Sequence, residues 1–267
     1  MRRKKNSKQP TAEIISIGNE LLIGYTLDTN SHWIARQLNR LGWILQRVTQ
    51  LRDSPDAIVS GIRESLRRRP LVLVTLGGLG PTHDDMTLAG VAKALRRPMK
   101  LNREALQLVE EHYRGLESKP KLTKYRTKMA TLPRGATPLP NPVGTAPGVM
   151  VKQSGTTMFS LPGVPSEMKA IFRSSIVSFL GSFHANRPNE LQFKIAGIIE
   201  SALAPILDEA RWAYPGLYFK SHPRGRETGS RPLILLQIYN TVPDSEDDVI
   251  KAAEHIIERV ASIKRKE

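Results

Sequence analysis

Two hydrophobic patterns alternate along the first half of the chain. Short apolar runs at residues 12–17, 43–48 and 71–76 are typical of buried strands. The segments after them carry apolar residues three and four positions apart, which predicts amphipathic helices. Strand, helix and strand repeated at this spacing favour right-handed crossovers and a mostly parallel sheet covered on both faces. The expected fold class is therefore α/β, with three αβα layers.

Capping residues set the expected helix ends in this part of the chain. The predicted helices run from the cap segment Asp28–Ser31 to Gly42, from Ser54 to Pro70, from Thr87 to about Leu95, from Arg103 to about Tyr113, and from Pro165 to about Leu180. Two further strands are predicted at residues 149–151 and 157–160. Residues 117–135 are basic and rich in turn-forming residues, and their pattern predicts no element.

A change of composition divides the chain. Hydrophobic periodicity lapses over residues 181–189, which predicts a linker. Beyond it, strands and helices are expected in the order βαββα, at residues 191–199, 201–210, 217–221, 232–239 and 245–263. We therefore expect three regions along the sequence: a disordered basic tail over residues 1–10, a first domain over 11–181, and a second, smaller α+β domain over 190–267.

Composition narrows the class of protein. The 267 residues are 40% hydrophobic and 24% charged, as in globular proteins, and the absence of cysteine excludes disulfides and thiolate metal sites. No apolar run is long enough to span a membrane, and no apolar stretch follows the charged N-terminus as in a secretory signal. We therefore expect a cytoplasmic protein with no membrane association.

The formal net charge of +15 invites a nucleic-acid interpretation. Part of this charge lies in the N-terminal tail, and much of the rest is spread along helix faces. Aromatic residues make up 6% of the chain, and no strand interleaves aromatic and basic residues into a base-stacking platform. Specific nucleic-acid binding is therefore not expected, and a positive field that attracts anionic small molecules is the simpler explanation.

The clearest chemical signal is the glycine-rich segment Thr75–Thr87, TLGGLGPTHDDMT. It follows a buried strand and precedes a helix, so it lies at the carboxyl edge of the sheet, where open α/β folds bind ligands. Its glycines let a ligand approach the backbone amides, which favours an anion site, and Asp84 and Asp85 add oxygens for a metal or a ribose hydroxyl. The structural alternative is a tight turn in which Asp85 or Thr87 caps the helix.

Three further segments should meet this loop at the same edge: Gly18–Leu22, Asn141–Gly148 and Leu161–Met168. Asp84 and Asp85 are candidate metal-binding residues, and Glu20 lies at the end of the first strand. Candidate ligand-binding residues are Gly18, Asn30, Thr75, Gly77, Gly78, Gly80, Thr82, Asn141, Gly144, Thr145, Pro162, Gly163 and Glu167. Structural alternatives stay open, because Glu20 could brace its loop, Asn30 could cap a helix, Thr145 could be a turn hydroxyl and Glu167 could complement a helix dipole.

Other catalytic templates do not fit the sequence. No histidine pair has the H-x-x-x-H spacing of a zinc site, and no G-x-S-x-G elbow is present. The glycine segment is neither a Rossmann fingerprint nor a Walker A loop. His83 could act as a general base or contact a ligand or solvent.

These segments together resemble the signature motifs of the N-terminal domain of the CinA family. That domain is similar to the molybdopterin-binding domains of Mog and MoaB type and to the N-terminal domain of animal FAD synthases. The resemblance covers about residues 12–180. The smaller α+β domain over residues 190–267 resembles the family's small following domain in the segments GIIES (197–201) and KSHPRG (220–225). Many bacterial members continue into a nicotinamide-mononucleotide deamidase domain; this chain ends at Glu267, so that activity is expected to be absent.

The resemblance implies that Glu20, Asp84 and Asp85 are candidate catalytic and metal-binding residues. It also implies two activities. One is divalent-metal-dependent hydrolysis of ADP-ribose or a related dinucleotide such as FAD, with Mg²⁺, Mn²⁺ or Co²⁺ and a monovalent cation as candidate cofactors. The other is molybdopterin binding in cofactor biosynthesis, without hydrolysis. A third hypothesis is a basic nucleic-acid-binding or regulatory protein. The resemblance and the small second domain also lead us to expect a homodimer or a higher homo-oligomer.

Overall fold

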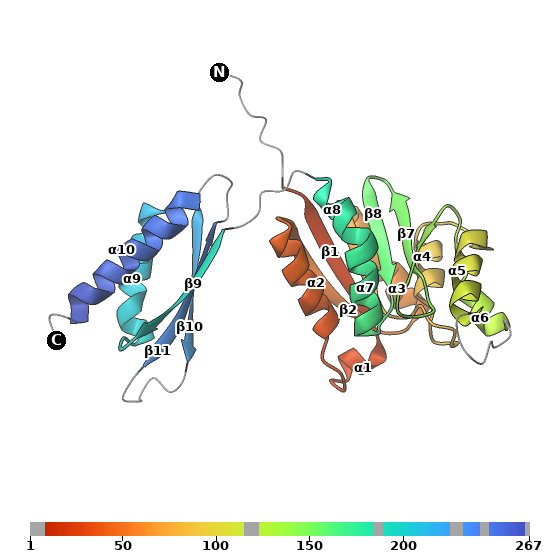
Figure 1. Cartoon of the computed structure of the whole chain (residues 1–267), viewed down its shortest axis with the longest axis horizontal. Helices are drawn as coiled ribbons and strands as arrows, with labels where there is room; N and C mark the ends of the chain where they lie inside the picture. Colours follow the sequence, from red (N-terminus) through yellow and green to blue (C-terminus); the bar gives the residue numbers. More distant parts are fainter. Residues whose placement is uncertain (1–8, 115–122, 184–188, 225–231, 241–245, 265–267) are drawn as a thin grey trace, which may run out of the picture. The chain divides into compact units, whose positions relative to one another are not determined.

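The computed structural model describes residues 9–114, 123–183, 189–224, 232–240 and 246–264, and the chain divides into two compact units, residues 1–185 and 186–267 (Figure 1). Residues 1–8 of the predicted tail and 184–188 of the predicted linker lie outside the described residues. None of the described helices is long and apolar enough to cross a lipid bilayer.

A six-stranded sheet in the order β2-β1-β3-β8-β7-β6 forms the centre of the first unit. Its strands are β1 (Thr11–Ile17), β2 (Ile44–Leu51), β3 (Val72–Leu76), β6 (Thr137–Leu139), β7 (Gly148–Gln153) and β8 (Thr156–Leu161). β2, β1, β3 and β8 are parallel, whereas β7 pairs antiparallel with both neighbours. Only Ser154 and Gly155 join β7 to β8, and a two-residue connection permits only an antiparallel pair.

Helices cover both faces of this sheet, as predicted (Figure 1). One face carries α2 (Thr29–Arg40), α7 (Pro165–Ile171) and α8 (Val177–Gly181); the other carries α3 (Pro55–Arg68), α4 (Thr87–Ala94) and α5 (Arg103–Arg114). Side chains of β1 alternate between the two cores. Ile14 packs with the α2 side and Ile15 with the α3 side, and both are fully buried. The three-layer αβα prediction is confirmed.

Some elements differ from the prediction. The expected helix over 165–180 contains a π-helical turn, η1 (Phe172–Ile176), between α7 and α8. Short elements carried too little pattern to be predicted: α1 (Asn19–Leu22), β4 (Met99–Leu101), α6 (Lys124–Lys128), β5 (Thr131–Pro133) and β6. Four of these five have three or four residues, shorter than the windows in which periodicity is recognisable.

The second unit has the predicted βαββα order: β9 (Glu190–Ala196), α9 (Glu200–Ala213), β10 (Leu217–Arg224), β11 (Leu233–Asn240) and α10 (Glu246–Lys264). Its three strands form an antiparallel sheet in the order β10-β11-β9. Alternate residues of β11, namely Ile234, Leu236 and Ile238, are buried with apolar residues of α9 and α10.

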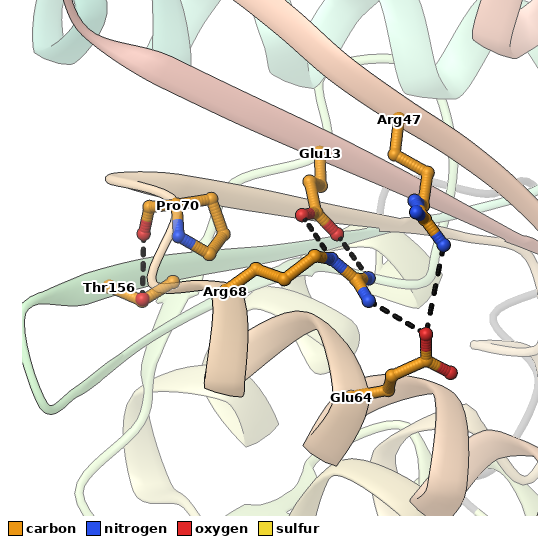
Figure 2. Close-up of polar contacts among 6 residues, drawn as sticks. All are labelled: Glu13, Arg47, Glu64, Arg68, Pro70 and Thr156. Atoms are coloured by element: carbon orange, nitrogen blue, oxygen red, sulfur yellow. Dashed lines mark hydrogen bonds and ion pairs between the residues drawn. The ribbon is translucent and has the colours of Figure 1, made fainter.

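A buried ion pair joins β1 to α3 in the first unit (Figure 2). Arg68 donates two hydrogen bonds of 2.7 Å to the carboxylate of Glu13, whose side chain is 1% exposed. The same guanidinium contacts Glu64 at 2.8 Å, and Glu64 lies 3.7 Å from Arg47. Beside this network, Thr156 donates a 2.7 Å hydrogen bond to the carbonyl of Pro70 and so connects β8 to the start of β3.

Candidate functional site

A cavity of about 610 Å³ opens at the carboxyl ends of β1, β3 and β8. The chain segments that leave these three strands form its wall: residues 17–21, 76–81 and 162–165. This is the edge where parallel α/β sheets bind ligands. Twelve of the sixteen predicted site residues line the cavity: Gly18, Glu20, Asn30, Gly77, Gly78, Gly80, Asp84, Asp85, Thr145, Pro162, Gly163 and Glu167.

Hydrogen bonds hold the start and the end of the glycine loop. The amide of Gly77 donates to the carbonyl of Leu161 at 3.0 Å. Thr87 donates its hydroxyl to the carbonyl of Gly77 at 2.8 Å and its amide to that of Gly78 at 3.2 Å. In contrast, the amides of Gly78, Leu79 and Gly80 donate no hydrogen bond to any other described residue. Since all three residues line the cavity, their amides are free to bind an anion.

Gly77 has to be glycine for two separate reasons. Its φ of +93° lies in the left-handed region, and an added Cβ would overlap the carbonyl oxygen of Ile17 in β1. We therefore expect Gly77→Ala to lower the free energy of unfolding by about 2 kcal/mol or more. Gly163→Ala is the matched control, because its Cβ would meet only an ordinary 3.5 Å contact. Denaturant unfolding of both variants is the measurement, and equal loss in both would contradict this explanation.

The two aspartates of the loop have different surroundings. Asp85 accepts hydrogen bonds from the amide of Thr82, at 2.9 Å, and from its hydroxyl, so it braces the loop; it does not cap α4. Asp84 is exposed and lies 3.9 Å from His83. The Thr82 hydroxyl, Asp84's own backbone amide and the charges of His83 and Lys128 hold the pKa of Asp84 below its ordinary value. Asp84 is therefore an anionic group available to a ligand or metal.

Asn141 holds Glu167, a residue of the cavity wall, in position by hydrogen bonds. Its amide group donates to Glu167 at 2.6 Å and to the carbonyl of Ala146 at 2.9 Å, while its oxygen accepts from the amide of Gly144 at 3.0 Å. A Cβ at Gly144 would overlap the Glu167 carboxylate. Asn141 and Gly144 do not line the cavity themselves; they fix Glu167, which does.

Asp28 and Asn30 bring the start of α2 into the cavity wall. Asp28 caps the helix by accepting from the amide of Ser31 at 2.9 Å, so the cap role left open for Asn30 belongs to Asp28. Asn30 donates a 2.7 Å hydrogen bond to the carbonyl of Gly163, and its side-chain oxygen is buried without a partner among the described residues. That oxygen is free to accept a hydrogen bond from a ligand.

The lowered pKa of Asp28 predicts that the stability of the fold depends on pH. Burial raises its pKa, but the hydrogen bonds it accepts, including 2.6 Å from Ser16, outweigh burial and hold the pKa below the ordinary value of 3.8. A lowered folded-state pKa stabilises the fold above pH 3.8, and this stability is lost as the pH falls through the folded-state pKa. Asp28→Asn should therefore flatten the acid side of the stability curve measured by denaturant unfolding. Asp56→Asn, at an exposed carboxylate, should leave that side unchanged.

Besides Asn141 and Gly144, two further predicted ligand-binding residues, Thr75 and Thr82, do not line the cavity. Thr75 is fully buried within β3 and donates its hydroxyl to Ser160 of β8 at 2.8 Å, because the two residues are paired in register and their side chains share one buried face of the sheet. Thr82 does not line the cavity, since its amide and hydroxyl are occupied by Asp85.

Other residues that line the cavity were not predicted from the sequence. Asp53 follows β2 at the same edge and accepts from the amide of Asn19 at 2.8 Å; its place after a strand was the available signal. Tyr113 and Met129 also line the cavity, and Lys128 donates to the carbonyl of Thr82. Lys128 and Met129 belong to the segment for which no element was predicted.

The charge of the cavity is the reverse of the charge of the chain. Its lining includes six carboxylates, Glu20, Asp28, Asp53, Asp84, Asp85 and Glu167, and no lysine, arginine or histidine among the described residues. The expected attraction of anions by a general positive field therefore does not apply inside this cavity. Within the described ranges, no three His, Asp or Glu side chains cluster closely enough to hold a metal ion by themselves.

Comparisons with known proteins identify the family. A model described as a probable molybdopterin binding domain matches residues 13–182. A protein of Aeropyrum pernix is 43% identical over 255 residues, 93% of each chain, and one of Pyrococcus abyssi is 46% identical over 206 residues, 74% of this chain and 80% of its own. The crystal structure of CinA, of unknown function, from Thermoplasma acidophilum has 36% identity and a TM-score of 0.58, covering 63% of this chain and 98% of that one. The chain therefore belongs to the family of the probable molybdopterin binding domain, and its first unit is a CinA-like member of that family.

Proposed function

We propose that this protein hydrolyses the pyrophosphate bond of a nucleotide such as ADP-ribose or FAD, with a divalent metal ion bound together with the substrate. The observation that carries the proposal is that six carboxylates line the same cavity as the amides of residues 78–80, which have no partner among the described residues. A diphosphate entering a cavity without basic side chains needs a cation to balance its charge.

The carboxylates suit such a cation if the substrate completes its coordination. They are spread around the cavity and do not form a cluster of three, so no closed metal site is formed by the protein alone. Mg²⁺ characteristically binds through one or two carboxylates, water and substrate phosphates. Glu20, Asp84 and Asp85 are the proposed protein ligands. When bound, the ion would neutralise diphosphate charge and polarise the phosphorus for attack by water.

The other residues have binding roles in this proposal. The amides of Gly78, Leu79 and Gly80 hold one phosphate, and the unpaired oxygen of Asn30 accepts from a ribose hydroxyl. Glu167, fixed by Asn141, limits the opposite side of the cavity. Water adds across the P–O–P bond of ADP-ribose, so the products are AMP and ribose 5-phosphate.

A direct test is incubation of the purified full-length protein with ADP-ribose, FAD and NAD in the presence of Mg²⁺, Mn²⁺ or Co²⁺, with chromatography of the products. Release of AMP that requires metal and stops with EDTA supports the proposal. A cavity that binds ADP-ribose in calorimetry but releases no AMP with any metal contradicts it.

A second candidate function is supported by the family model. We propose as the alternative that the same cavity holds a molybdopterin-type pterin phosphate in cofactor assembly, without hydrolysis. The amides of residues 78–80 would bind its phosphate, and the free Asn30 oxygen a ring N–H group. Tight pterin binding without release of AMP from ADP-ribose would select this alternative. In either case we place the protein in the cytoplasm.

We further propose that the chain works as a homodimer or a higher homo-oligomer. The sheet of the second unit packs its helices on one face only, because residues alternating with its core positions, such as Tyr218 and Tyr239, stay partly exposed. An uncovered sheet face is commonly covered by another chain. Light scattering at micromolar concentration should give a multiple of 29.8 kDa; the monomer mass would contradict this proposal.

A further inference from the structure

A second hollow in the first unit gathers the opposite kind of charge. It is an open groove of about 930 Å³ between α3, α4 and the turn from β7 to β8. Its lining includes the basic residues Arg63, Arg67, Arg69, Lys93 and Arg96, and a single carboxylate, Asp56, among the described residues. Arg69 comes shortly before β3 and Ser154 shortly before β8, so this end of the groove lies at the amino edge of the sheet. The groove runs along α3 toward Asp56 near the start of that helix, and it shares no lining residue with the carboxylate-lined cavity.

Most of these cations are not neutralised by the protein. Lys93 lies 3.4 Å from Asp56, and Arg63 donates to the carbonyls of Lys93 and Ala94 at the end of α4. The side chains of Arg67, Arg69 and Arg96 have no hydrogen-bond or ion-pair partner within the described part of the chain, and all three are exposed. The groove therefore presents unbalanced positive charge to an incoming anion.

Two of the arginines occupy positions that favour glycine. Arg69 ends α3 with φ +56°, and Arg96 follows α4 with φ +55°. The backbone bonds from Arg96 to Lys93 and from Arg97 to Ala92 form the helix-ending motif in which the left-handed residue is usually glycine. Helix dipoles explain basic residues in a last helical turn, but they do not explain a side chain where glycine would be more stable.

We propose that this groove binds the phosphate backbone of a nucleic acid without reading its bases. Arginine guanidinium groups make paired hydrogen bonds to phosphate oxygens, and four of the five cations are arginine. The described lining contains no aromatic residue on which a base could stack. Contacts of this kind fix a duplex by charge and geometry and carry no sequence information.

The test is fluorescence anisotropy of a labelled DNA duplex with the full-length protein at increasing salt. Arg69→Gly/Arg96→Gly removes two phosphate contacts, so the slope of log K against log salt should fall in magnitude by about 2, and affinity at about 50 mM salt should fall at least about tenfold. The same double variant should melt at or above the temperature of the unchanged chain, because glycine relieves two left-handed residues. A merely structural role for these arginines predicts the opposite change in melting temperature.

Two controls define the result. Arg40→Gln/Arg103→Gln removes two exposed arginines outside the groove and should leave the salt slope nearly unchanged, whereas Arg69→Lys/Arg96→Lys should keep most of the affinity. Equal losses in the glycine and control variants would overturn the proposal, as would a groove that binds inorganic polyphosphate or polyglutamate but not DNA. Tight DNA binding that depends on base sequence would also overturn it.

Discussion

Asp84→Ala is expected to lower metal-dependent hydrolysis of ADP-ribose by about a hundredfold or more while leaving the melting temperature unchanged. Asp84 lies in a solvent-exposed loop, its side chain is 65% exposed, and its one ion-pair contact within the described ranges is with His83 at 3.9 Å. Such a carboxylate contributes little to folding. A carboxylate that holds a metal ion against a diphosphate, by contrast, acts on charge that develops in the transition state, where loss of one group costs factors of this size.

Asp85→Ala is expected to affect both hydrolysis and the stability of the glycine loop. It should reduce hydrolysis to a similar degree, but it should also lower the free energy of unfolding by about 1 kcal/mol, because it removes the acceptor for the amide and hydroxyl of Thr82. Asp56→Ala, an exposed aspartate outside the cavity, is the control for both variants. Initial rates with saturating metal, combined with thermal unfolding, measure the two effects. Normal turnover by Asp84→Ala would show that this carboxylate is not part of the reaction site.

The largest effect on stability is expected at the Glu13–Arg68 pair (Figure 2). Arg68→Leu should lower the free energy of unfolding by about 3–5 kcal/mol, because it leaves the buried carboxylate of Glu13 without its two 2.7 Å hydrogen bonds. Glu64→Gln should cost less than about 1 kcal/mol, since the contacts of Glu64 lie at the surface. Arg67→Leu, at the exposed neighbouring position, should change stability by about 0.5 kcal/mol or less.

A double variant tests the physical reason for this loss. Glu13→Met/Arg68→Leu removes both charges and should recover most of the stability lost in Arg68→Leu, because the cost comes from the unpaired buried charge more than from the missing attraction. Urea unfolding of the single and double variants measures the recovery. If the double variant is no more stable than Arg68→Leu, the loss arises from packing of the arginine side chain and the charge explanation is wrong.

Local sequence signals predicted the main layers of the fold well. The apolar run at residues 71–76 and the residues after Ser54 correspond to β3 and α3, because a buried strand and an amphipathic helix each need a continuous pattern of their own. β4 and β6 have three residues each and are determined by their partner strands, β5 and β7. Such short strands leave too few positions for a pattern to be recognised.

The candidate site was predicted where it follows β1, β3 and β8 in the sequence. Gly77, Glu20 and Gly163 lie within three residues of the ends of β3, β1 and β8, so the rule that ligands bind at the carboxyl edge was sufficient to place them. Thr75 does not line the cavity, because strand alternation places its side chain on a buried face of the sheet beside Ser160. Asp53 was missed although it follows β2 at the same edge, whereas Tyr113 was missed because its place in the cavity depends on how α5 packs.

The sequence by itself determined the α/β class, the order of elements and the glycine loop, since each depends on residues adjacent in the chain. Only the tertiary structure decided the sign of the charge at each site. Carboxylates from six separate positions meet in one cavity, while arginines from the ends of α3 and α4 meet in a separate groove. A net charge of +15 is a sum over the chain, and a sum holds no information about which charges the fold brings within a few ångströms of one another.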